Sequence, residues 1–151
     1  MRGGAFGVGV GRARLAVAAI VVSAFVAGQT SAKAATDEVG MELNKLSNEA
    51  AGCQAYFVFD NQGASEYDKL KIDLVVFNSE DVFERRFAMS VAPLDAKKRT
   101  LRMFEFKKIA CDKIGSFLIN GVLECQQGKK TKTDCVQRLV PSSRVDVELT
   151  K

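Results

Sequence analysis

The stretch CQAYFVFD, residues 53–60, decides the fold that we predict for this chain. Ala55, Phe57 and Phe59 alternate with the residues between them, and aromatic and β-branched side chains dominate the stretch. A period of two with this composition is typical of a β-strand. We therefore expect these three side chains to share one face of a sheet and to lie in the core.

Six further segments show the same alternation between turn-forming residues: 39–43, 70–76, 83–91, 101–106, 116–124 and 145–149. About seven short strands in one domain predict an all-β fold, an immunoglobulin-like β-sandwich. Two helical segments are considered as well. Residues 37–51 form a short helix in an alternative interpretation, and residues 135–140 are expected to be helical. Residues 141–143 (PSS) are expected to break the chain.

Residues 1–34 have the pattern of a secretory signal peptide. Arg2, Arg12 and Arg14 precede an apolar run of 13 residues, LAVAAIVVSAFVA, which ends before the small-residue pattern Ala-Lys-Ala at 32–34. That run is shorter than the ~20 residues that a membrane span requires. We expect cleavage after Ala34, which leaves a single domain over residues 35–151 that does not span a membrane. An uncleaved N-terminal anchor is the alternative.

The export route and the charge balance both follow from this segment. Arg12 and Arg14 are separated by Ala13, so we expect the general secretory route to the periplasm. The first 35 residues contain four of the 22 basic residues and no acid, so 18 basic residues balance 18 acidic ones in the mature domain. A neutral balance gives no support to nucleic-acid binding, which depends on neutralising phosphates.

Four cysteines follow the signal peptide: Cys53, Cys111, Cys125 and Cys135. In an exported domain an even number predicts disulfides, and four cysteines allow three pairings. Cys125 and Cys135 flank the polar loop QQGKKTKTD, so we pair them with each other and Cys53 with Cys111. Two alternatives remain open: one disulfide with two free thiols, and a metal site. No C-x-x-C motif is present.

The chain contains no histidine, which excludes Ser-His-Asp and Cys-His catalysis. No P-loop and no Gly-rich dinucleotide motif follows a predicted strand, so we expect no cofactor, no metal and no catalytic residue. Among the acids, Asp73 and Glu84 are the carboxylate pair that a glycan hydrolase would use. The alternation places Asp73 towards water. Arg85 shares the predicted apolar face of residues 83–91, either at the rim of the core or paired there.

Several segments together resemble a group of small exported alphaproteobacterial proteins called Tat pathway signal sequence domain proteins. The segments that carry this resemblance are MELNKLSNEAAGCQAYFVFDNQ (41–62), LKIDLVVFNSEDV (70–82), RRFAMSVAPL (85–94) and CDKIGSFLINGVLEC (111–125). The resemblance implies a periplasmic location and four cysteines in this arrangement, and it implies no activity. The unpaired arginines depart from the group's name. The middle of the chain also resembles FxLYD-type immunoglobulin-like modules, which implies the same sandwich.

The remaining candidate site is the loop between Cys125 and Cys135, which contains Lys129, Lys130 and Lys132. A basic loop closed by a disulfide favours contact with an acidic partner. We therefore predict a non-enzymatic periplasmic binding module whose partner is another envelope protein or a glycan. Two alternatives are a carboxylate-dependent hydrolase of envelope glycan and a protein that uses its thiols for redox chemistry or metal handling.

Overall fold

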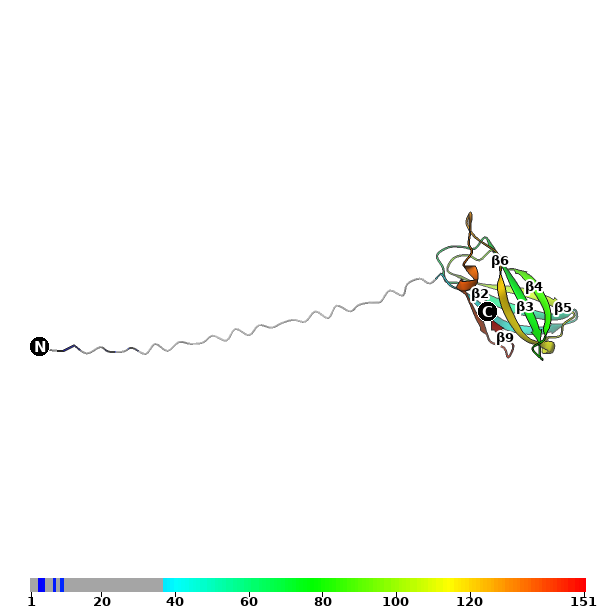
Figure 1. The fold of residues 1–151 in the computed structure, drawn as a ribbon, viewed down its shortest axis with the longest axis horizontal. Coiled ribbons are helices and arrows are strands. Elements are labelled where there is room, and N and C mark those ends of the chain that lie inside the picture. The colour runs from blue at the N-terminus through cyan, green and yellow to red at the C-terminus, as the bar shows by residue number, and fades with distance from the viewer. Residues whose placement is uncertain (1–2, 5–6, 8, 10–36) are drawn as a thin grey trace. The chain divides into compact units, whose positions relative to one another are not determined.

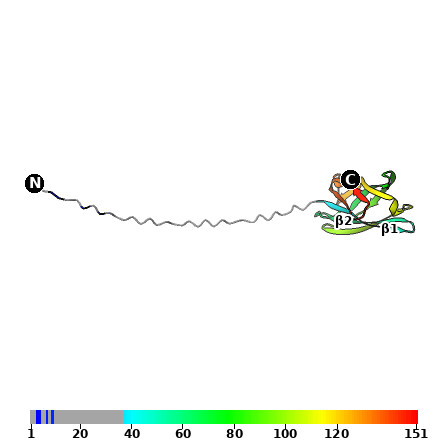
Figure 2. The ribbon, with the colours of Figure 1, turned by 90° about the horizontal axis from the view of Figure 1, so that it is seen from below.

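The computed structural model describes residues 3–4, 7, 9 and 37–151 (Figure 1). The predicted signal peptide therefore lies outside the described residues, apart from four glycines. Residues 37–151 form a β-sandwich of two sheets, as the alternation predicts. The first sheet has the order β5-β2-β1-β8 and the second β4-β3-β6-β7, with β9 also paired to β6. Figure 2 shows the two sheets as separate layers, with β1 and β2 in the same one.

The strands are β1 (Val39–Glu49), β2 (Gly52–Asn61), β3 (Lys69–Asn78), β4 (Phe83–Ser90), β5 (Lys98–Lys107), β6 (Ile114–Gln127), β7 (Lys130–Thr131), β8 (Leu139–Ser143) and β9 (Glu148–Thr150). A 3₁₀ turn, η1 (Cys111–Lys113), precedes β6, and a single helical turn, α1 (Cys135–Arg138), precedes β8. Most neighbouring strands are antiparallel. The two parallel pairs are β1 with β8 and β6 with β9.

The core lies between the sheets and is centred on β2. Ala55, Phe57 and Phe59 are all fully buried, which confirms the face predicted for them. The ring of Phe57 packs edge-on against Phe104 of β5 at 6.1 Å and against Phe117 of β6 at 5.9 Å between ring centroids. Because β2 and β6 belong to different sheets, the contact with Phe117 helps to hold the two layers together.

Both disulfides have the predicted pairing. Cys53 on β2 is joined to Cys111 in η1, and Cys125 on β6 is joined to Cys135 in α1. All four cysteines are oxidised, so none is a free thiol. The first bond ties the connection before β6 to the first sheet, and the second closes the loop that contains β7.

Three sequence-based expectations about the elements need correction. Residues 37–151 form nine strands where we expected about seven, because β7 and β8 carry too few alternating residues to be recognised. The strand expected over residues 39–43 is confirmed as part of β1, so the alternative of a helix over residues 37–51 is wrong. The expected helix over 135–140 stops at Arg138, and Pro141 lies within β8 instead of breaking the chain. Pro141 is tolerated there because β8 is an edge strand, where a missing N–H costs least.

Arg85 lies at the rim of the core. Its guanidinium lies 5.8 Å from the centroid of the Phe87 ring, and Nη1 donates to the carbonyl oxygen of Lys107 at 3.1 Å. The side chain therefore covers apolar surface and also bridges β4 and β5, the facing edge strands of the two sheets.

Among the described residues, no helix has the length and apolarity that crossing a membrane requires.

Candidate functional site

The basic loop leaves β6 as a tight hairpin. Gly128 occupies the left-handed region with φ 57°, where a side chain would be strained, and Gln127 then pairs with Lys130 across the turn. Lys129 and Lys130 are exposed. The amide of Lys132 donates to the carbonyl oxygen of Cys125 at 3.0 Å, and the disulfide follows three residues later. The loop is thus fixed at both ends.

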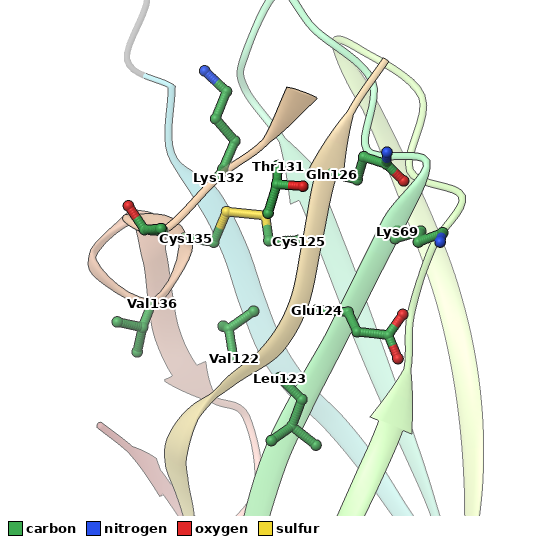
Figure 3. A pocket seen from close by; sticks show the side chains of 11 residues that line it. Lys69, Val122, Leu123, Glu124, Cys125, Gln126, Thr131, Lys132, Cys135 and Val136 are labelled. Atoms are coloured by element: carbon green, nitrogen blue, oxygen red, sulfur yellow. A yellow bond between two sulfur atoms is a disulfide. The ribbon is translucent and has the colours of Figure 1, made fainter. Parts of the chain in front are cut away.

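A cavity of about 500 Å³ lies between this loop and β6 (Figure 3). Val122 on β6 and Val136 on α1 lie on opposite sides of it, with the Cys125–Cys135 bond beside them. The remaining lining residues are Lys69, Leu123, Glu124, Gln126, Thr131, Lys132 and Thr133. The lining therefore combines apolar side chains with charged and polar ones.

The acids beside the cavity are already engaged by basic side chains. Glu124 pairs with Lys71 at 3.3 Å, and Asp134 accepts from Nη2 of Arg138 at 2.7 Å. The hydrogen bonds from Arg138 lower the pKa of the Asp134 carboxyl and raise the pKa of the Arg138 guanidinium. Arg138 also pairs with Asp37 at 3.0 Å, which ties α1 to the segment that enters β1.

The lysines beside the cavity have no such partners. Among the described residues, Lys69, Lys129, Lys130 and Lys132 form no ion pair within 4.0 Å. Two of these lysines line the cavity, Lys69 from β3 and Lys132 from the loop, while Lys129 and Lys130 lie in the hairpin of the same loop. Sequence patterns did not indicate Lys69, because it lies more than 50 residues before the loop, and they did not show that Val122 and Val136 both line the cavity.

The sequence placed Asp73 towards water, and this is wrong. Asp73 does point away from the core, but only 3% of it is exposed. Arg86 covers it, with Nε donating to Oδ1 at 2.5 Å and Nη2 donating to Oδ2 at 2.6 Å. Asn120 of β6 donates to Oδ2 at 2.6 Å. These hydrogen bonds, those from Arg86 above all, lower the pKa of the Asp73 carboxyl.

The candidate carboxylate pair is not assembled. Asp73 lies opposite Ala88 in the pairing of β3 with β4, and Glu84 lies four residues further along β4. That spacing is roughly 13 Å of strand, whereas glycosidase carboxylates are about 5–9.5 Å apart. Glu84 lines a second cavity of about 320 Å³, together with Lys108 and Lys113. Asp73 does not line it.

The buried Asp73 carboxylate makes stability depend on acid. Its pKa is lowered in the folded state, so its contribution is complete above the ordinary aspartate value of about 3.9 and is lost as the pH falls through the folded value. Asp73→Asn should lower the free energy of unfolding by about 2 kcal/mol at pH 7. From about pH 4 downwards, the free energy of unfolding of this variant should fall less steeply with pH than that of the unaltered protein. Urea unfolding at pH 7 and at about pH 3 measures both effects.

Glu84→Gln is the matched control for this prediction, because Glu84 is exposed and makes no ion pair among residues 37–151. The free energy of unfolding of the control should depend on pH below about pH 4 as it does in the unaltered protein. If Asp73→Asn retains the same dependence on pH as well, the carboxylate is not ionised beneath Arg86, and the arrangement described above is wrong.

No group of three or more Cys, Asp and Glu side chains in the described part of the chain is arranged to hold a metal ion.

No family model matches the chain, and the searches of curated proteins and of solved structures gave no match either. The candidate site therefore rests on its own geometry, namely the cavity, the loop fixed at both ends and four lysines that form no ion pair within residues 37–151.

Proposed function

We propose that the mature chain is a non-catalytic binding module of the cell envelope and works in the periplasm. The observation that carries this proposal is the cavity between β6 and the disulfide-closed loop, which Lys69 and Lys132 line and beside which the same loop carries Lys129 and Lys130; none of the four forms an ion pair among the described residues. The partner that suits such a surface is an envelope protein or glycan that carries negative charge.

Two features support the location. Disulfides form and persist in oxidising compartments such as the periplasm, and both pairs of cysteines are joined here. The sequence of residues 1–34 adds the pattern of an export signal. We propose that this segment is removed after Ala34 and that the domain from residue 35 onwards is the functional form.

The strand order supports the immunoglobulin-like part of the proposal. The sequence β1-β2-β5 in one sheet and β4-β3-β6 in the other corresponds to strands A, B and E facing C′, C and F of that architecture. The last two strands depart from it, since β8 and β9 run parallel to their neighbours. Binding through loops and strand edges at the ends of such a sandwich is a common mode of action.

Site-specific photocrosslinking in the cell envelope tests the proposal. A photoreactive amino acid replaces Lys130 in the loop, and in a matched control it replaces Ala88, an exposed residue of β4. We expect a discrete adduct from position 130 that is absent from position 88, and mass spectrometry of the adduct identifies the partner. A protein that forms no adduct from position 130, or forms the same adducts from both positions, contradicts binding at this loop.

A further inference from the structure

Strand β6 has a gap in its pairing on the side away from β3. On that side β9 pairs with residues 116–118, and β7 pairs with Gln126 and Gln127. Within residues 37–151, the backbone hydrogen bond that reaches the intervening edge is the one from Lys132 to the oxygen of Cys125. Residues 119–124 therefore present an unpaired strand edge roughly 20 Å long.

The cavity follows this edge. Five consecutive residues of β6, from 122 to 126, line it. Four of these, residues 122–125, lie between the segments of β6 that pair with β9 and with β7, so the cavity lies beside the unpaired part of the strand. Val136 of α1 and residues 131–133 line the same cavity. The space is thus placed where a neighbouring strand would lie.

We propose that this gap binds an extended, acidic peptide segment that pairs with residues 119–124 of β6 as an added strand. The inference rests on the proposed function and specifies its ligand. Backbone groups of the unpaired edge supply the hydrogen bonds, and one apolar side chain of the segment lies between Val122 and Val136. The Cys125–Cys135 bond, with a Cα–Cα distance of 6.5 Å, leaves no room for another strand and marks one end of the site.

The charge around the gap selects acidic segments. The four lysines named above form no ion pair within the described ranges, while Glu124 is paired with Lys71 and Asp134 with Arg138. Asp68 accepts from the amide of Gly128 at 2.5 Å, which uses that carboxylate within the hairpin. An acidic segment gains attraction from each unpaired lysine, and a basic segment is repelled.

The edges of β4 and β5 are covered by arginines. On the side where β4 and β5 face each other, Arg85 donates to the oxygen of Lys107. Arg102 donates from Nε to the oxygen of Val91 at 2.9 Å and from Nη2 to the oxygen of Pro93 at 2.8 Å. Side chains of this kind protect edges against strand addition. The gap in β6 combines a free edge with a cavity, so it is the edge that we assign to the ligand.

Fluorescence anisotropy with a labelled eight-residue peptide that alternates Glu and Val tests the inference on the mature protein. We expect binding that weakens as NaCl is added, and no binding of the matching peptide that alternates Lys and Val. Two further peptides carry N-methyl groups, one on every Glu and the other on every Val. Because alternate amides of a strand face opposite sides, strand addition predicts that one of these two loses binding and the other retains it.

Variants of the protein locate the site. Lys129→Gln, Lys130→Gln and Lys132→Gln combined should weaken binding about tenfold. The control with the same change of charge combines Lys107→Gln, Lys108→Gln and Lys113→Gln and should bind as the unaltered protein does. Val136→Trp fills the cavity and should abolish binding. Gln137→Trp, at an exposed position of the same helical turn, should not.

Each result decides the inference. If both N-methylated peptides bind equally, the ligand does not add as a strand, and the inference is wrong while the binding site remains. Failure of the Glu-Val peptide to bind also overturns it. Photocrosslinking from position 130 is independent of any chosen peptide, so an adduct there keeps the proposed function even when the acidic strand fails.

Discussion

Replacing Phe57 with alanine should lower the free energy of unfolding by about 4 kcal/mol. The ring is fully buried and packs against Phe104 in its own sheet and Phe117 in the other. Removing it leaves a cavity between the two layers, and the surrounding rings are held by strands that cannot move inward without losing their pairing. Equilibrium unfolding in guanidinium chloride measures the loss. The dependence of the free energy of unfolding on denaturant concentration is compared between the variants.

Phe83→Ala is the matched control for this prediction. It removes the same ring from the start of β4, where Phe83 is 60% exposed. The expected change is within about 0.5 kcal/mol, since substitutions of exposed residues rarely cost more. Equal losses in the two variants would show that the alternating face of β2 does not form the core, and would contradict the sandwich.

The second large effect concerns the disulfide between Cys53 and Cys111. Its partners are 58 residues apart, and the restriction of the unfolded chain by a loop of that length is worth about 4 kcal/mol. Combining Cys53→Ala with Cys111→Ala should therefore remove about 4 kcal/mol of stability. Cys53 is fully buried on β2, so lost packing adds to the entropic cost.

The second disulfide gives an internal comparison. Cys125 and Cys135 are 10 residues apart, and the same relation gives about 3 kcal/mol. We expect Cys125→Ala with Cys135→Ala to be the milder pair for stability and the more damaging pair for binding, because it frees the lysine loop. Guanidinium unfolding and peptide anisotropy of both double variants test this. A reversed order in either measurement contradicts the roles assigned to the two bonds.

The strongest features of the fold could be predicted from the sequence because they depend on period alone. Residues 53–60 alternate without a break, and the structure buries the predicted face. The polar loop between Cys125 and Cys135 likewise indicated a local disulfide. By contrast, the two-residue strand β7 is too short to show a period. Pro141 of β8 suggested a break in the chain. An edge strand tolerates a proline, but the sequence does not show which strands lie at the edges of a sheet.

The irregular part of β6 shows why the site itself was not predictable. Alternation from Phe117 and Ile119 would continue to Leu123 and place it in the core, yet Leu123 is 52% exposed. Two shifts of register against β3 fall in this segment, and they turn Val122 inward instead. One shift also brings Asn120 to Asp73, which the sequence had left in water. Bulges of this kind are set by the partner strand, and no local pattern reports them.

The charge of the loop could be predicted from the sequence, and its surroundings could not. Lys129, Lys130 and Lys132 are adjacent in sequence, so their charge was evident. Lys69 comes from β3 and Val136 from α1. Their meeting depends on how the Cys125–Cys135 bond holds α1 beside β6, which is a property of the assembled sheet.

Amide hydrogen exchange of β6, measured by NMR with and without the peptide that alternates Glu and Val, tests the central claim most directly. The free protein should exchange quickly at the amides of residues 119–124 that face the gap, and slowly at those that face β3. Added peptide should protect the fast set and leave β4 and β5 unchanged. Protection that appears along β4 or β5, or that fails to appear between residues 119 and 124, would contradict the assignment of this edge as the binding site.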